Sequence, residues 1–308
     1  MRLRRLLTGL TAAIAATLAL DRLLRRMASP LPPAVAGRPS TVRDAGIETA
    51  VVEAGAPTGP EVIFVHGTYV GASSREFADL VEHLPADLRL VLVDLPGFGR
   101  SGRPSVDYDI ERLAGGLASV IDECGEPPTV VASGQALPVT VAAAEQADID
   151  RLIAIGPRTE NDRRRPILAT LLETPVIGTM AYLGLSSRPA LAAHLVDTLE
   201  LHQTGLTDDH LSYAWRSAHQ PGSVGAATAW IGGDLDVLDD LETLLDSVDV
   251  DTALVIGEEA PTPSLEAVRS AAERIDATLS TVSASGAFPH ITAPDAVAAH
   301  LVDEALLA

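Results

Sequence analysis

The sequence contains no lysine, one cysteine and few aromatic residues. All 22 basic residues are arginines, against 42 acidic residues, so the formal net charge is -20 and the pI is about 4.6. Without a basic stripe the chain cannot neutralise a run of phosphates, which argues against nucleic-acid binding. The lone Cys124 excludes an intrachain disulfide and offers no metal-ligand spacing, and we expect it to be a small buried residue.

High acidity combined with few aromatic residues can indicate disorder, but other features of the composition oppose that interpretation. Hydrophobic residues make up 47% of the 308 residues, and the mean hydropathy is +0.22. This is enough apolar material for one large domain, or for a domain with an insertion. We interpret the charge as an acidic, halophile-like shell around a folded core, in which salt screens the self-repulsion.

The first 28 residues differ from the rest of the chain in charge. Residues 1–26 contain six arginines and one aspartate, a charge of +5, which leaves -25 on the remainder. The uncharged stretch 6–20 would be about 22 Å long as a helix, which is short for a bilayer core of about 30 Å. Arginines on both flanks favour a membrane-surface helix or short anchor. A cleaved signal and a soluble cap helix remain alternatives. Residues 29–46 then form a proline-rich tether.

Beyond the tether, strand-like apolar runs alternate with helical patterns. The strand candidates are 49–55, 61–67, 88–97, 128–134, 151–157, 251–259 and 277–286, and the helical segments are 74–84, 109–123, 135–147, 264–275 and 294–307. Nearly continuous Val, Ile and Leu is typical of buried parallel strands. The pattern predicts an α/β fold with a doubly wound, mostly parallel sheet over 47–308. A long helical gap predicts an inserted cap at about 158–250.

The stretch "VVASGQALP", residues 130–138, has the pattern of a strand, a sharp turn and a helix. In the nucleophile elbow G-x-S-x-G, such a turn presents a serine above the sheet, and small flanking residues allow close packing. Here the flanking residues are Ala132 and Ala136, but the centre is Gly134. The turn therefore has the pattern of an elbow without its nucleophile.

Several motifs together resemble the α/β-hydrolase fold family over about residues 47–306. "VIFVHGT" resembles its oxyanion-loop motif, "VDLPGFGRSGRP" resembles the loop after the next strand, and the cap lies where members of the family carry a lid. The chain resembles in particular haloarchaeal α/β-fold hydrolases with an N-terminal hydrophobic segment, a group to which "WRSAHQPGS" is also similar. The resemblance implies a triad in the chain order Ser, acid, His.

The triad positions implied by this resemblance lack all three catalytic side chains. They hold Gly134 for the nucleophile, Ala260 for the acid and Ala287 for the base. Because triad members act as a unit, loss of one removes the value of the others. The three coincident losses indicate a degenerate triad.

Three nearby residues are candidates for displaced chemistry. Ser133 precedes the expected nucleophile position, His290 follows the expected base, and Glu160 lies in the charged loop that enters the cap. A hydroxyl, an imidazole and a carboxylate within hydrogen-bond reach near Gly134 would support an active enzyme.

The binding apparatus of the family is better preserved in this sequence. Backbone N–H groups near Thr68 and Gln135 would form an oxyanion hole, with His66, Gly67 and Tyr69 beside it. Four cap aromatics would line an apolar pocket or pack the cap core: Tyr182, Tyr213, Trp215 and Trp230. We expect no metal and no cofactor, because the cap histidines do not repeat a known ligand motif.

These observations favour a noncatalytic ligand-binding or interaction protein that descends from a hydrolase. The ligand would be a small apolar molecule or a carbonyl compound, and a protein partner stays unspecified. The alternatives are a carboxylic-ester-type hydrolase that uses displaced residues, and a structural membrane-surface protein whose cap is the partner site. We expect membrane association through residues 1–28, and otherwise a cytoplasmic location.

Overall fold

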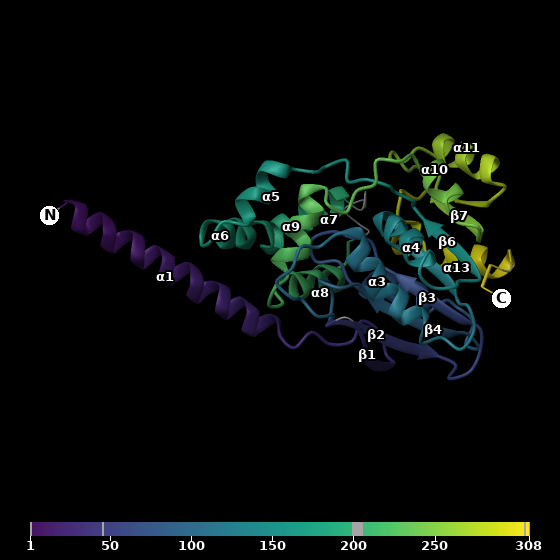
Figure 1. Cartoon of the computed structure of the whole chain (residues 1–308), viewed down its shortest axis with the longest axis horizontal. Coiled ribbons are helices and arrows are strands. Elements are labelled where there is room, and N and C mark those ends of the chain that lie inside the picture. The colour runs from purple at the N-terminus through teal and green to yellow at the C-terminus, as the bar shows by residue number, and fades with distance from the viewer. Residues whose placement is uncertain (1, 45, 199–205, 305, 308) are drawn as a thin grey trace.

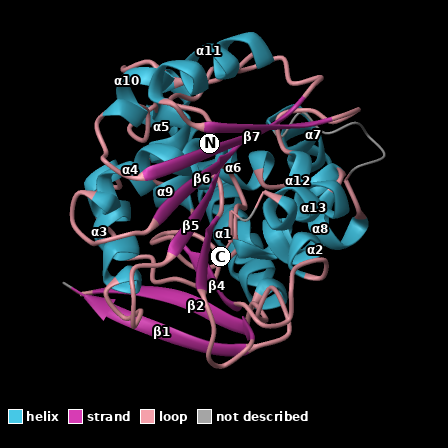
Figure 2. Ribbon diagram, turned by 90° about the vertical axis from the view of Figure 1, so that its right-hand side faces the viewer, coloured by secondary structure: helices cyan, strands magenta, loops and turns pink. Residues whose placement is uncertain are grey.

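An eight-stranded sheet forms the centre of the main domain (Figure 2). The computed structural model describes residues 2–44, 46–198, 206–304 and 306–307. The strand order is β1-β2-β4-β3-β5-β6-β7-β8, in which β1 and β2 are antiparallel and the strands from β4 to β8 are parallel. The strands are β1 (Arg38–Asp44), β2 (Ile47–Gly55), β3 (Glu61–Val65), β4 (Arg89–Asp94), β5 (Thr129–Ser133), β6 (Arg151–Ile155), β7 (Asp251–Gly257) and β8 (Thr278–Val282). This confirms the α/β fold and the mostly parallel sheet.

The central strands are buried on both faces because helices cover both sides of the sheet. Along β3, Ile63 and Val65 pack into one core, whereas Val62 and Phe64 pack into the other. This alternation follows from the period of two of an extended strand. The first core packs against α3 (Ile110–Ile121), α4 (Leu137–Ala144) and α11 (Leu265–Ile275), and the second against η1 (Ser74–Phe77), α2 (Ala78–Val81) and α13 (Pro294–Asp303).

The helical insertion lies between β6 and β7 and forms the cap (Figure 1). Its helices are α5 (Pro166–Leu172), α6 (Ile177–Leu185), α7 (Arg188–Thr198), α8 (Asp208–Ala218) and α9 (Val224–Gly232). The last helix before β7, α10 (Leu241–Asp246), contacts α11 and α4 instead. Although α10 falls within the predicted cap range, it therefore packs on the main domain.

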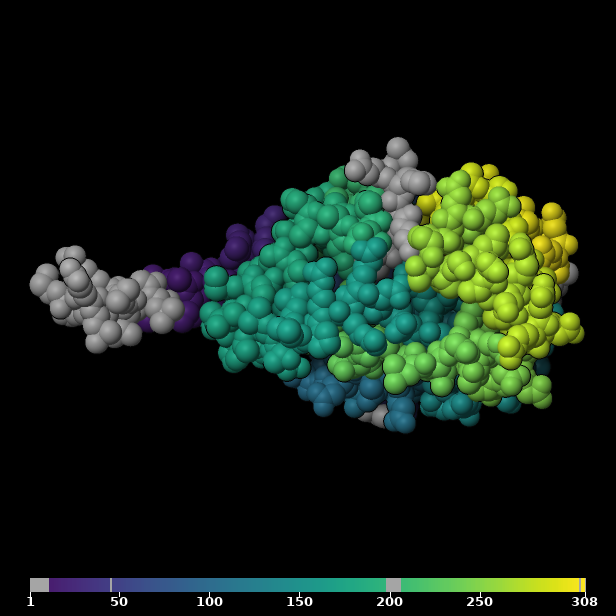
Figure 3. All heavy atoms as spheres, turned by 90° about the horizontal axis from the view of Figure 1, so that it is seen from above, coloured from purple at the N-terminus to yellow at the C-terminus, as the bar shows by residue number. Residues whose placement is uncertain are grey.

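The N-terminal helix α1 (Arg2–Ala28) projects from the body on the side of the cap (Figures 1 and 3). Its contacts are with α6 and α8. None of the described helices combines the length and the apolar character that a membrane crossing requires.

The segment after α1 differs from the expected free tether. The Ala28 carbonyl accepts a hydrogen bond of 3.1 Å from Gln220 Nε2, and the Tyr213 hydroxyl donates to the Pro32 carbonyl at 2.6 Å. Residues 38–44 form β1, which pairs with β2 along its whole length. Proline-rich composition predicted an extended chain but did not reveal that α8 and β2 hold it.

Candidate active site

The turn at Gly134 has the backbone of a nucleophile elbow. It follows β5 directly and leads through a short 3-10 turn, Gly134–Ala136, into α4. Gly134 has φ of +53°, a conformation that costs glycine little and strains other residues. A Cβ atom here would lie 2.8 Å from Phe288 Cε1. The ring of Phe288 therefore occupies the space that a nucleophile side chain would need.

The pocket above this elbow is nearly filled. Its volume is about 20 Å³, which is room for about one water molecule. The lining includes Gly67, Thr68, Tyr69, Gln135, Arg158, Trp230 and Phe288. The Arg158 guanidinium carbon lies 5.5 Å from the centroid of the Phe288 ring, so an arginine covers the blocking phenyl group. An ester substrate does not fit in this space.

Gln135, beside the nucleophile position, ties the elbow to the cap. Its Oε1 accepts a hydrogen bond of 2.8 Å from Trp230 Nε1, and its Nε2 donates to the Leu235 carbonyl at 3.3 Å. The same Nε2 also donates to the Asp236 carboxylate. Burial raises the pKa of Asp236, although hydrogen bonds from Asn161 and Gln135 oppose the rise. These bonds hold the cap closed over the elbow.

Ser133 and His290 come together in the structure, with a third residue that the sequence analysis did not single out. Ser133 Oγ lies 3.4 Å from His290 Nε2, and that nitrogen lies 2.9 Å from Glu76 Oε1. Ser133 and His290 are fully buried, and Glu76 is nearly so. The triad order of the family places the acid late in the chain, so it does not point to Glu76, which lies in η1.

The Glu76 carboxylate accepts hydrogen bonds from several parts of the chain. The Tyr69 hydroxyl donates to Oε2 at 2.9 Å, and the Gly67 backbone N–H donates to the same oxygen at 3.2 Å. Burial alone would raise the pKa of Glu76, but hydrogen bonds from His290 and Ser133, together with the charge of His290, hold it below its ordinary value. Burial and the negative Glu76 raise the pKa of Tyr69. The carboxylate is thus ionised and well satisfied.

This buried cluster does not have the geometry of a working triad. In a triad the acid bonds one imidazole nitrogen and the serine bonds the other. Here both partners share Nε2 of His290, while Nδ1 is buried and lacks a hydrogen-bond partner within the described part of the chain. Because a carboxylate accepts, Nε2 carries the proton that it donates to Glu76. It therefore has no lone pair with which to take the Ser133 proton.

The other candidate residues lie apart from this cluster. Glu160 is exposed, and Arg164 Nη1 lies 3.6 Å from its carboxylate. Ala260 and Ala287 are buried among apolar residues, and neither can supply an acid or a base. His66 accepts from the Leu95 N–H at 3.1 Å through Nε2, and its Nδ1 donates to the Gly67 carbonyl at 2.8 Å. His66 therefore braces the oxyanion loop through both ring nitrogens.

The cap aromatics divide between packing and a cavity. The Tyr182 hydroxyl donates to the Ala218 carbonyl at 2.9 Å, Tyr213 bonds the N-terminal segment, and the Trp215 ring centroid lies 4.4 Å from that of His219. These three side chains pack within the cap or against the N-terminal segment. Only Trp230 among the four lines a described pocket. The described residues contain no cluster of three metal-binding side chains.

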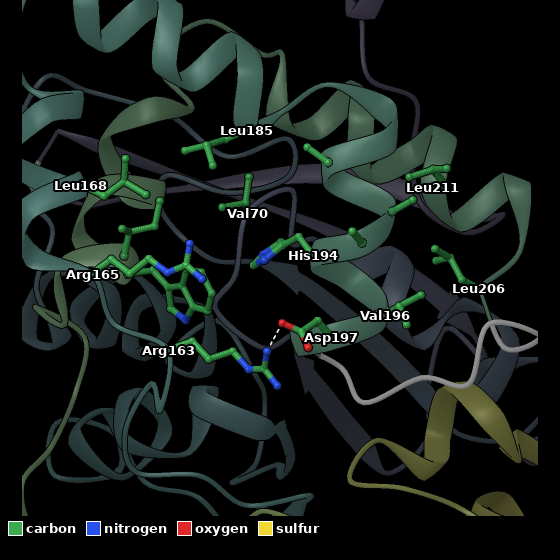
Figure 4. A pocket seen from close by; sticks show the side chains of 15 residues that line it. Val70, Arg163, Arg165, Leu168, Leu185, His194, Val196, Asp197, Leu206 and Leu211 are labelled. Carbon is green, nitrogen blue, oxygen red and sulfur yellow. Dashed lines mark hydrogen bonds and ion pairs between the residues drawn. The ribbon is translucent and has the colours of Figure 1, made fainter.

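A second, much larger cavity, partly open to solvent, lies among the cap helices (Figure 4). Its volume is about 840 Å³, within the range of small-molecule sites. Side chains from α5, α6, α7, α8 and α9 line it, with Val70 from the main domain. Trp230 borders both this cavity and the elbow pocket, so its indole lies between them. The sequence analysis expected an apolar pocket under the cap but named only Trp230 among these residues.

Most of the chain is similar in sequence to one known family. A family model described as "Alpha/beta hydrolase family" matches residues 62–300. The chain belongs to the alpha/beta hydrolase family. The AB hydrolase superfamily protein YisY of Bacillus subtilis is 29% identical over 142 residues, which is 44% of this chain and 52% of YisY. A haloalkane dehalogenase of Mesorhizobium japonicum is 37% identical over 79 residues, 26% of this chain and 25% of the dehalogenase.

The chain thus spans about a quarter to a half of the length of these curated relatives, and solved structures extend the likeness in fold. A serine hydrolase of carbazole degradation has a TM-score of 0.67 at 19% identity and covers 88% of this chain and 99% of its own. A membrane phospholipase A described as a bacterial virulence factor has a TM-score of 0.66 at 20% identity, with both chains covered completely. At this identity the structural likeness concerns the fold.

Proposed function

We propose that this member of the alpha/beta hydrolase family is a noncatalytic binding protein that holds a small, largely apolar ligand in its cap cavity. The observation that supports this most directly is the pair of cavities. The elbow pocket has about 20 Å³ and Phe288 beside Gly134, whereas the cap cavity has about 840 Å³. The pocket above Gly134 is thus too small for a ligand, whereas the cap cavity is large enough to hold one.

The alternative, a hydrolase that works through displaced residues, has weaker support. Ser133 and His290 are in contact, but both are fully buried and His290 uses the shared nitrogen for Glu76. Glu160 does not join them. A carbonyl compound at the former oxyanion hole is disfavoured for a related reason, because the space beside Thr68 and Gln135 holds about one water molecule.

Two measurements on the purified full chain test this proposal. Hydrolysis of p-nitrophenyl butyrate should not exceed the buffer rate, and Ser133→Ala and His290→Ala should leave that rate unchanged. Calorimetric titration with 1-decanol should show saturable binding. Ala190→Phe, which places a ring in the cap cavity, should weaken that binding at least about tenfold. The matched control is Ala299→Phe, on the exposed surface of α13. Turnover that is abolished by His290→Ala would overturn the proposal.

We also propose that α1 attaches the protein to a membrane surface. Support comes from its apolar side chains, since Leu20, Leu23 and Met27 are between 47% and 62% exposed. Arg22, Arg25 and Arg26 lie among them, as in helices that bind anionic bilayers. The full-length structural likeness to a membrane phospholipase A is consistent with this role. In this proposal the cap stands next to the lipid, because α1 contacts α6 and α8.

A further inference from the structure

We propose that the cap cavity selects a single-chain amphiphile that carries one anionic headgroup, such as a medium-chain carboxylate. The inference rests on the proposed binding function and names its ligand class. The cavity combines long apolar walls with a small charged group on one side (Figure 4).

The apolar walls come from helices that surround the cavity. Leu168 is contributed by α5, Leu185 by α6, and Leu211 by α8, while Trp230 and Ile231 come from α9. These side chains present surface that gains free energy when an apolar ligand covers it, at about 25 cal/mol per Å². A hydrocarbon chain provides such a ligand without polar groups to desolvate.

The charged group consists of two arginines and one aspartate. Arg163 and Asp197 form an ion pair, drawn as a dashed line in Figure 4. Arg165 lines the same cavity, is exposed to solvent and makes no ion pair within the described part of the chain. Counting these three side chains leaves one unbalanced positive charge. A ligand with a single negative charge would balance it.

His194 lies on the same wall and does not compete for the anion. Its imidazole centroid lies 5.2 Å from that of Trp230. Burial, together with the positive charges of Arg163 and Arg165, lowers the pKa of His194 to about 4. The ring is therefore neutral near pH 7, and both arginines lie near enough to affect it electrostatically. Of the three charged side chains, Arg165 is the one without an ionic partner among the described residues; it is exposed at the edge of the cavity, and its side chain points toward His194 (Figure 4).

The net positive charge of these three side chains is unusual in so acidic a molecule. The chain carries a formal charge of -20, so its general field repels anions. A local positive charge beside an apolar cavity therefore favours one orientation, with the headgroup at Arg165 and the hydrocarbon among the leucines. A guanidinium suits a carboxylate headgroup, because it offers two parallel N–H donors.

The inference is tested with three probes that have similar saturated hydrocarbon tails and differ in their headgroup. Decanoate, 1-decanol and decyltrimethylammonium are titrated into the full chain by calorimetry at pH 7.5, below their micelle concentrations. Decanoate should bind at least about tenfold more tightly than 1-decanol, as expected for one charge-assisted hydrogen-bonded pair. Arg165→Gln should remove this preference, so that decanoate binds no more tightly than 1-decanol.

Controls separate loss of charge from loss of folding. Arg43→Gln removes an exposed arginine of β1 and should leave all three affinities unchanged. Arg163→Gln gives a second variant at the cavity, in which the unpaired Asp197 should also abolish the preference for decanoate.

Each contrary outcome has a distinct meaning. Equal affinities for decanoate and 1-decanol, both weakened by Ala190→Phe, would overturn the headgroup assignment and leave the binding function intact. Preference for decyltrimethylammonium would overturn it as well and would point to Asp197 as the dominant charge. If none of the three probes bound, the proposed function itself would fail.

Discussion

At residue scale, Gly134 and Phe288 form a matched pair. The glycine allows a φ of +53°, and its missing side chain leaves room for the phenyl ring. A serine at this position would be strained and would also displace Phe288. A serine introduced at Gly134 alone would therefore supply neither an open pocket nor a base.

We predict that Gly134→Ser destabilises the fold by about 1–3 kcal/mol and creates no esterase activity. Denaturant unfolding and p-nitrophenyl butyrate hydrolysis provide the two measurements. Adding Phe288→Ala removes the contact at 2.8 Å but also deletes a buried ring, which costs about 3–5 kcal/mol, so the double variant should be less stable than Gly134→Ser alone. Turnover, if any, is expected only when Ala260→Asp and Ala287→His are also present. Turnover in the single Gly134→Ser variant would contradict the degenerate-triad interpretation.

Glu76 is the second residue whose side chain organises its surroundings. It is buried and accepts hydrogen bonds from Tyr69, Gly67 and His290. We predict that Glu76→Gln destabilises the protein by about 3–5 kcal/mol, because it leaves the buried histidine without its charged partner. Chemical denaturation at pH 7 measures the loss. Glu160→Gln, at an exposed carboxylate, should change stability by less than about 0.5 kcal/mol.

The lowered pKa of Glu76 also gives this prediction a pH dependence. Its folded pKa is below the ordinary value of 4.5, so the folded state favours the ionised form. The resulting stability is present above pH 4.5 and is lost as the pH falls through the lower folded pKa. Glu76→Gln should remove this part of the acid sensitivity. A variant with the same acid-unfolding profile as wild type would show that Glu76 does not contribute.

At the scale of elements, α1 and the segment that follows it have different roles. The side chains of Ala28 and Leu31 are buried. Tyr213, Arg216 and Gln220 of the cap region donate hydrogen bonds to backbone carbonyls of this segment. The part of α1 before Ala28 has exposed apolar side chains instead. If α1 attaches the protein to a membrane as proposed, the boundary between anchor and domain therefore lies at Ala28 and not at the end of the proline-rich stretch.

We predict that a chain lacking residues 1–27 stays folded and no longer floats with anionic liposomes. A chain lacking residues 1–37 should lose about 1–2 kcal/mol more, because it also loses the buried Ala28 and Leu31 side chains. Liposome flotation and thermal unfolding of the two truncations measure these effects. Failure of the full-length protein to float would contradict the membrane proposal.

At the scale of the whole molecule, we expect the acidic residues to govern how stability responds to salt. Of the 42 acidic residues, 41 lie beyond residue 26. Most ion pairs of the described residues are at least partly exposed, as with Arg43–Glu48 and Arg188–Asp208, and such pairs contribute little. Repulsion among the remaining carboxylates is therefore poorly compensated inside the molecule.

We predict that the thermal midpoint rises by several degrees between about 0.05 M and about 2 M KCl, since the Debye length shrinks to a few ångströms. Scanning calorimetry at the two KCl concentrations measures the shift of the midpoint. A midpoint that does not change with KCl would contradict the halophile-like interpretation of the acidic shell.

The sequence by itself determined the elements that depend on local pattern. Continuous apolar runs predicted the central strands, and the small residues around Gly134 predicted the elbow turn with a glycine at its centre. These follow from periodicity and backbone preference, which neighbouring residues decide. The strand at 38–44 was missed, because its polar residues are recruited by pairing with β2 rather than by burial.

Only the tertiary structure decided which side chains meet. Glu76 and His290 are 214 positions apart, and no spacing rule links a carboxylate in η1 to an imidazole in α12 (Pro289–Thr292). The position of Phe288 over Gly134 and the charged wall of the cap cavity likewise depend on how the cap and the last loops pack on the sheet. Such contacts arise from long-range packing, where volume and charge are matched in space and leave no periodic signal along the chain.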